Sequence, residues 1–367
     1  MKMKSHNLYF LFLIRFYLYI PFNSSIIVIE DSPRYGENNI PPNLRRESVI
    51  MKKHVRNLLL LTTLTGISIY GINKTISISS SMKNLLRTDR GKFFNWRYGN
   101  IFYTKQGKGS PILLIHDLNP ASSSFEWEKV SKHLAKHYTV YTLDLLGCGR
   151  SDKPNMTYSN FLYVQLITDF IKNIIGSKTN IIVTGESSSF TLMACNMDSE
   201  YFDKIMIINP SDLSDLCRTP NKRKNALKFF IDLPIIGTLV YNLVYLKKNV
   251  EKLFYKDYFY KDYMVPTKVL DSYYESSHLG NSHGKYLLSS IKANYTNINI
   301  IHALRKINNS IYLIVSKEKE GNEEIVNSYI SCNPSIEASY ISSSKYLPQL
   351  EVPNNLLDIL NLYLESK

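Results

Sequence analysis

Short apolar runs separated by longer amphipathic stretches dominate most of the chain. Such runs predict strands buried on both faces, as in a parallel sheet. A hairpin around Gly99-Asn100 is expected to precede them, formed by Phe94–Tyr98 and Ile101–Lys105. Helical periodicity in Tyr158–Ile175 favours right-handed crossovers between the strands. The expected buried strands are Ile112–Ile115, Thr139–Leu143, Asn180–Val183, Lys204–Ile208, Ile311–Val315 and one near Ile336–Ile341, followed by a final helix at about Asn354–Leu364.

The alternation stops after Pro210, and residues 214–296 are rich in Leu, Tyr and Lys. This stretch predicts helices. Leu227–Leu246 is apolar enough to suggest a membrane span, but Asp232, Pro234 and Gly237 interrupt it. Two short helices of an inserted cap are therefore the favoured interpretation.

A separate apolar run, Leu58–Ile72, follows the basic residues Lys52, Lys53 and Arg56. Its length approaches that of a membrane span, and the basic flank favours a cytoplasmic N-terminal end. We expect an uncleaved anchor in a bacterial cell membrane, with the following domain on the outer side. A signal peptide is the rival interpretation, although the run lacks a small-residue cleavage site.

The first fifty residues do not resemble the rest of the chain in sequence pattern. A purine-rich coding stretch is expected at Arg45-Arg46-Glu47, just before Met51-Lys52-Lys53, which is typical of a bacterial start. We therefore expect residues 1–50 to be a non-native or disordered extension. The alternative is a second apolar anchor at Leu8–Phe22.

The net charge of +13 fits a solvated surface close to anionic lipid. No basic cluster coincides with a nucleic-acid-binding motif, so a nucleic-acid partner is not expected. The four cysteines have no C-x-x-C spacing, and neither a metal constellation nor a dinucleotide fingerprint is present. We expect no cofactor and no metal.

Four motifs carry candidate chemistry. Gly185-Glu186-Ser187-Ser188-Ser189 follows an apolar run and precedes a helical stretch, which predicts a strand–turn–helix elbow centred on a serine. The other motifs are the strand ending in His116-Asp117-Leu118, the segment from Ser122 to Trp127, and Asp144-Leu145-Leu146-Gly147-Cys148-Gly149-Arg150-Ser151-Asp152-Lys153-Pro154.

In these motifs and their order, the chain resembles the α/β-hydrolase superfamily, in its esterase, haloperoxidase and epoxide-hydrolase-like branch. The resemblance covers roughly residues 93–367. It implies an α/β fold with a doubly wound, mostly parallel sheet and a helical lid insertion. The expected organisation is an extension at 1–50, anchor and linker at 51–82, the first part of the core at 83–213, the lid at 214–296 and the second part of the core at 297–367.

The resemblance also implies roles for individual residues. Ser187 would be the nucleophile, and the backbone N–H groups of Ser188 and Leu118 would stabilise the oxyanion, with Asp117 replacing a family glycine beside them. The acid would be Glu320, with Glu318 and Asp212 as alternatives. The family's last motif aligns with Lys345-Tyr346-Leu347-Pro348-Gln349-Leu350-Glu351-Val352-Pro353, which places Tyr346 where the catalytic His stands.

Three interpretations of function follow. The first is a membrane-anchored serine hydrolase that acts on small-molecule or lipid-like carboxylic esters through Ser187, with His278 or His283 as a substitute base. The second is an esterase of low activity that retains only the elbow and the oxyanion donors. The third is a catalytically inactive pseudo-hydrolase that serves as a binding or scaffold protein.

Overall fold

The computed structural model describes residues 42–261 and 265–365, with side chains from Lys53 onward. The chain divides into two compact units, 1–62 and 63–367. The described part of the first unit belongs to helix α2 (Pro42–Ser80), which continues into the second unit. The expectations for Leu8–Phe22 and for most of the extension lie outside the described residues.

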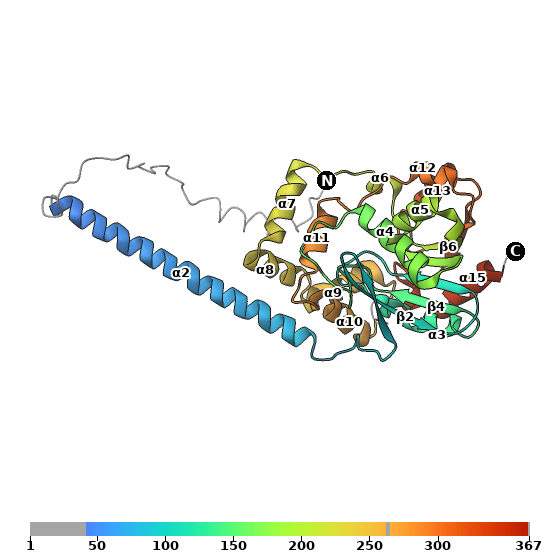
Figure 1. The fold of residues 1–367 in the computed structure, drawn as a ribbon, viewed down its shortest axis with the longest axis horizontal. Coiled ribbons are helices and arrows are strands. Elements are labelled where there is room, and N and C mark those ends of the chain that lie inside the picture. Colours follow the sequence, from blue (N-terminus) through green and yellow to red (C-terminus); the bar gives the residue numbers. More distant parts are fainter. Residues whose placement is uncertain (1–41, 262–264, 366–367) are drawn as a thin grey trace. The chain divides into compact units, whose positions relative to one another are not determined.

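One eight-stranded sheet forms the centre of the second unit (Figure 1). Its order is β1-β2-β4-β3-β5-β6-β7-β8; β1 and β2 are antiparallel to their neighbours, and the others are parallel. The α/β-hydrolase fold expected from the sequence is confirmed. The strands are β1 (Gly91–Trp96), β2 (Gly99–Gln106), β3 (Pro111–Ile115), β4 (Thr139–Leu143), β5 (Thr179–Thr184), β6 (Phe202–Ile208), β7 (Ile311–Ser316) and β8 (Glu337–Ile341).

The opening hairpin differs from the expectation in register. Trp96 pairs with Gly99, so Arg97 and Tyr98 form the turn rather than Gly99-Asn100. Gly99 has a φ of 146° and comes close to Asp152, which explains the glycine without making it a turn centre.

Alternation along the buried strands divides the core between the two faces of the sheet. Leu113 and Val183 belong to a cluster with helices on one face, whereas Ile112 and Ile182 pack with helices on the other. Figure 1 shows the two groups of helices. The first group is α4 (Asn160–Phe170), α5 (Ser187–Met197), α12 (Ile301–Lys306) and α13 (Asn322–Cys332); the second is α3 (Glu128–Leu134) and α15 (Pro353–Glu365).

The stretch between β6 and β7 is helical. It includes α6 (Leu213–Leu216), α7 (Lys222–Asp232), α8 (Ile235–Val244), α9 (Lys247–Leu253), α10 (Thr267–His278) and α11 (Lys285–Lys292). Side chains from α8, α9 and α10 build an aromatic cluster with Leu347 and Leu350, which lie in and next to α14 (Pro348–Glu351). The helical insertion is thus joined to the core by a packed apolar layer.

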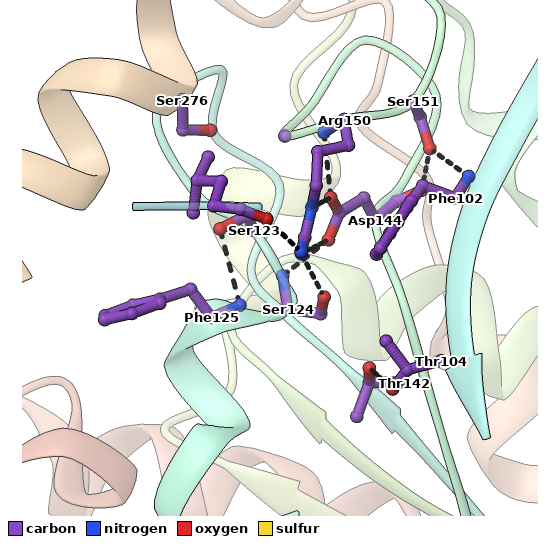
Figure 2. A network of polar contacts seen from close by, with 12 residues as sticks. Phe102, Thr104, Ser123, Ser124, Phe125, Thr142, Asp144, Arg150, Ser151 and Ser276 are labelled. Carbon is purple, nitrogen blue, oxygen red and sulfur yellow. Dashed lines mark hydrogen bonds and ion pairs between the residues drawn. The ribbon is translucent and has the colours of Figure 1, made fainter. Parts of the chain in front are cut away.

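A buried ion pair fixes the loop after β4, close to the carboxyl edge of the sheet (Figure 2). The Arg150 guanidinium contacts both carboxylate oxygens of fully buried Asp144, at 2.8 and 3.1 Å. It also donates to the Leu86 carbonyl and the Ser124 hydroxyl. Burial opposes ionisation of Asp144, but Arg150 holds the pKa of this carboxyl well below its usual range. A Cβ on Gly149 would lie 2.3 Å from Asp144 Oδ2, so the turn needs a glycine.

We expect Arg150→Ala to destabilise the fold by about 3–5 kcal/mol, because it leaves the Asp144 carboxylate buried without its cation. Urea denaturation of the purified protein measures the change. Arg97→Ala is the matched control, since Arg97 pairs with Asp169 at 3.0 Å but is half exposed. Its expected cost is below about 1 kcal/mol. Equal losses in the two variants would contradict the structural role assigned to Arg150.

Candidate functional site

The turn between β5 and α5 is centred on a glycine. Gly185 has a φ of 60°, in the left-handed region, and α5 begins two residues later at Ser187. The expectation of an elbow centred on Ser187 is therefore corrected. The physical reason is conformational: the sharp turn directly after the strand requires a positive φ, which glycine adopts without a steric cost.

Ser187 and Ser188 are fully buried in the first turn of α5. Ser187 Oγ donates to the carbonyl of His116 at 2.7 Å, and Ser188 Oγ donates to the carbonyl of Gly185 at 2.7 Å. The backbone N–H of Ser188 also points to the Gly185 carbonyl, at 3.2 Å. The Ser187 hydroxyl therefore ties the turn to the residue after β3, whereas the Ser188 hydroxyl and N–H are both used within the turn and the helix start. This corrects the role expected for the Ser188 N–H as an oxyanion donor.

Two backbone N–H groups do converge at the elbow, and a carboxylate occupies the point where they meet. Leu118 N and Glu186 N both donate to Asp117 Oδ1, at 2.8 Å each. The Leu118 N–H thus lies at the elbow together with the Glu186 N–H rather than the Ser188 N–H. The Asp117 side chain, which the sequence left free to point either way, points inward.

Tyr346 completes the coordination of this carboxylate. Its hydroxyl donates to Asp117 Oδ2 at 2.6 Å, and its ring stacks on Tyr258 with centroids 5.1 Å apart. Burial and the neighbouring Asp117 raise the pKa of Tyr346 well above its ordinary value, so the phenol stays a neutral donor. A Cβ on Gly185 would lie 2.3 Å from Asp117 Oδ1 and 2.5 Å from the Tyr346 hydroxyl. Glycine is therefore required at this position for a second, steric reason.

A lysine, and not the predicted acid, lies next to Tyr346. Lys319 Nζ is 5.1 Å from the Tyr346 ring centroid, and burial lowers the pKa of its ammonium group. Glu320 is exposed one residue further along the same loop. The carboxylate of Glu318 accepts the backbone N–H groups of Ser343 and Ser344, at 2.8 and 3.4 Å, and so fixes the loop that leads to Tyr346. Neither glutamate contacts the elbow in the part of the chain that the structure describes.

The remaining candidates have structural contacts elsewhere. Asp212 caps α6 by accepting the Ser214 N–H at 2.7 Å. His278 is buried in the helical insertion, where Nδ1 lies 2.8 Å from the Tyr274 carbonyl and 2.9 Å from Ser277 Oγ. His283 contacts the ring of Tyr286. The structure does not bring these groups into contact with Ser187 among the described residues.

Beside the elbow, side chains from the helical insertion fill the space and satisfy one another. Glu126 is fully buried and accepts the Tyr273 hydroxyl at 2.5 Å and the Gln349 amide at 3.2 Å. Burial raises the pKa of Glu126 to about 7. Asn119, next to the elbow, exchanges hydrogen bonds with Tyr245 and Tyr258. Within the described residues, no group of three His, Cys, Asp or Glu side chains is arranged to hold a metal.

Sequence reasoning missed Gly185, Glu186 and Lys319. Signals for them were present: a glycine directly after a buried strand favours the left-handed turn, and three serines in a row directly before Phe190 fit a helix start. The position of Lys319 depends on a one-residue register in a polar loop, which the sequence does not define.

Comparisons with known proteins agree with the fold. Residues 112–273 match the family described as "Alpha/beta hydrolase family". A 2-hydroxy-6-oxo-6-(2'-aminophenyl)hexa-2,4-dienoic acid hydrolase of Metapseudomonas resinovorans is 30% identical over 113 residues, which are 30% of this chain and 39% of that protein. A haloalkane dehalogenase of Agrobacterium fabrum is 36% identical over 59 residues, covering 16% and 19%. The matches thus span well under half of the length of these relatives.

Solved structures match over a longer stretch at lower identity. A serine hydrolase involved in carbazole degradation has a TM-score of 0.62 and 17% identity, covering 76% of this chain and 99% of its own. A bromoperoxidase from Bacillus anthracis has a TM-score of 0.60 and 15% identity, covering 75% and 100%. At this level of identity the likeness concerns the fold. Together with the sheet order and the family match over residues 112–273, it shows that the chain has the α/β-hydrolase fold.

Proposed function

We propose that this chain is a membrane-tethered α/β-hydrolase-fold protein that does not hydrolyse esters through a serine and acts instead as a binding or scaffold protein. The observation that carries the proposal is the position of Asp117. Its carboxylate accepts the N–H groups of Leu118 and Glu186, which converge on one point at the elbow.

An ester-hydrolysing site needs those two donors to be free. Negative charge develops on the carbonyl oxygen in the transition state, and preorganised N–H groups aimed at that oxygen stabilise it. Here Asp117 Oδ1 already accepts both N–H groups at 2.8 Å. A substrate carbonyl would have to displace the carboxylate, and an oxyanion formed beside it would be repelled by a like charge.

Among the described residues, the site also has no activated nucleophile. The residue at the left-handed turn after β5 is Gly185, which has no side chain. Ser187 Oγ is buried and donates to a carbonyl oxygen, whereas a serine nucleophile must donate to a base that removes its proton. The groups that flank Gly185 are a neutral phenol, Tyr346, and the buried carboxylate of Asp117. Lys319, over the Tyr346 ring, compensates part of that carboxylate's charge.

The alternative is ester hydrolysis through Ser187; two of the similar proteins are named as hydrolases, one of them as a serine hydrolase. It would require Ser187 to leave the His116 carbonyl and Asp117 to leave the elbow. The packed aromatic layer of the helical insertion opposes such a rearrangement, because Tyr245, Tyr258 and Tyr273 are all buried.

Membrane tethering is the second part of the proposal. The segment Lys53–Ser80 of α2 is long and apolar enough to span a bilayer. None of the residues in its most apolar stretch is buried inside the protein. At 1.5 Å per residue, its 28 residues extend over about 42 Å, which exceeds a hydrocarbon core of about 30 Å. Side chains along it, such as Leu60 and Leu64, are more than half exposed.

The catalytic part is tested with a fluorophosphonate probe and p-nitrophenyl acetate. We expect the wild type and Ser187→Ala to behave alike, with neither labelling nor turnover. A combined variant with Asp117→Gly, Gly185→Ser, Lys319→Asp and Tyr346→His should gain both, because it frees the two N–H donors and supplies a nucleophile with a base. General-base catalysis alone is worth about 10²–10⁴-fold.

The matched control is the same combination without Gly185→Ser, which should fold but remain unlabelled. Circular dichroism and thermal unfolding check that both variants are folded. Labelling of the wild type that Ser187→Ala removes would overturn the proposal. A folded combined variant that remains unlabelled would contradict the assignment of Gly185 to the nucleophile position.

The tether is tested by alkaline carbonate extraction of membranes from cells that express the full chain. We expect the wild type in the carbonate-resistant pellet and the double variant Leu60→Lys, Leu64→Lys in the supernatant. Each lysine costs about 3 kcal/mol near the centre of a spanning helix. Phe161→Lys with Met197→Lys is the control, since both residues are equally exposed but lie in α4 and α5. A wild type that carbonate extracts completely would contradict the tether.

A further inference from the structure

An exposed apolar corner is formed where α7 meets α8. The two helices are bent by 100° at a short break around Pro234. Just before the break, Phe229 and Phe230 are 64% and 59% exposed. Just after it, Ile235 and Ile236 are also exposed. Side chains of this size gathered at one corner indicate a contact surface, because soluble proteins rarely leave such a group facing water.

The corner is attached to the apolar part of α2. Asn242 of α8 donates to Asn73 Oδ1 at 2.8 Å, and Asn73 Nδ2 donates to the Ile235 carbonyl at 3.3 Å. Both asparagines are buried. Closer to the N-terminal end of α2, the Ile235 side chain lies 3.9 Å from the point that a Cβ on Gly66 would occupy.

This contact sets the depth of the corner. Gly66 lies six residues before Ile72, the C-terminal end of the apolar run, which is about 9 Å along the helix axis at 1.5 Å per residue. If α2 crosses a bilayer with that run, a side chain that reaches Gly66 lies below the headgroups. The corner that carries Ile235 would then enter the membrane together with α2.

The backbone carbonyl groups at the corner are hydrogen-bonded by the protein itself and so do not depend on water. A break between helices leaves carbonyl groups without intrahelical partners. Buried Lys285 donates to the carbonyls of Leu233 and Pro234, at 2.8 and 3.2 Å, and to the Thr238 hydroxyl. Irregular backbone at membrane depth is tolerated where the protein itself satisfies such groups.

The charges near the corner fit the same environment. Lys228, beside Phe229, is paired with Asp232 at 2.5 Å, so the charge next to the aromatic rings is compensated. Exposed cations lie further away, at Lys222 and Arg223 at the start of α7 and at Lys248 in α9. Apolar tips flanked by cations are typical of elements that lie in the interface of an anionic membrane.

From these observations we infer that the α7–α8 corner inserts into the interfacial region of an anionic lipid bilayer beside α2, so that the helical insertion is seated on the membrane. The inference rests on the membrane tether proposed above. The group that covers the corner is therefore inferred to be lipid. Binding of a protein partner would require neither the position of the corner beside Gly66 nor the hydrogen bonds from Lys285 to the carbonyls at the helix break.

The test uses the full chain reconstituted into vesicles of phosphatidylcholine and phosphatidylglycerol, with and without brominated acyl chains that quench tryptophan. Three single variants carry the reporter: Phe230→Trp in the corner, Leu64→Trp in α2 and Phe161→Trp in α4 as the exposed control. The emission of the unsubstituted protein, which contains buried Trp96 and Trp127, is subtracted.

We expect brominated lipid to reduce the added emission of Phe230→Trp and Leu64→Trp and to leave that of Phe161→Trp unchanged. Loss of emission for Leu64→Trp alone would overturn the inference while the tether stands. Loss for neither would remove the tether and the inference together. An unquenched Phe230→Trp whose emission shifts to the blue with rising protein concentration would identify a second copy of the chain as the occupant and would equally overturn the inference.

Discussion

Backbone N–H groups at the ends of strands and helices have no partner within their own element, and this protein satisfies many of them with carboxylates. Asp144 accepts the N–H groups of Ser124 and Arg150, and Glu275 accepts those of Leu85 and Leu86. Glu351 accepts three more, from Tyr260, Lys261 and Lys345. The loops around the carboxyl edge of the sheet depend on these bonds for their positions. In a hydrolase, the pair of N–H groups at the elbow is the exception that stays free for the reaction. Here the Asp117 carboxylate accepts both of those N–H groups as well.

The residues around the elbow fit one another as a set. With Asp117 inward, a side chain on Gly185 would collide with its carboxylate and with the Tyr346 hydroxyl. Tyr346 donates to the outer oxygen of that carboxylate, and Lys319 lies over the Tyr346 ring. A histidine introduced at position 346 alone would face a carboxylate and a glycine instead of a serine hydroxyl. Catalysis would therefore need several changes together, which is why the arrangement supports a stable non-catalytic site better than an incomplete catalytic one.

The sequence defined the sheet well because each buried strand is a short apolar run bounded by turn residues. β3 and β4 begin within one residue of the expected positions and end at the expected ones, and the helical insertion begins where the alternation stops. The site was less predictable, since it depends on the direction of side chains in turns. The motif centred on Ser187 contained both a serine and a glycine that could occupy the turn, and only the backbone conformation distinguishes them. In the loop after β7, one residue of register separates exposed Glu320 from Lys319 at the site, and polar loops carry no periodic pattern to fix that register.

A filled elbow changes what the helical insertion can do. A lid that admits substrate must move, and motion requires a weakly held interface. The insertion instead contributes Tyr258 and Tyr273 to a buried aromatic cluster, and both hydroxyls are bonded to residues outside it, Asn119 and Glu126. Its other side is bonded to α2 through the buried pair Asn73 and Asn242. An insertion held on both sides does not open easily to admit a substrate. For the binding role proposed above, an insertion held in this way offers a rigid surface, whereas a substrate-admitting lid would need to move.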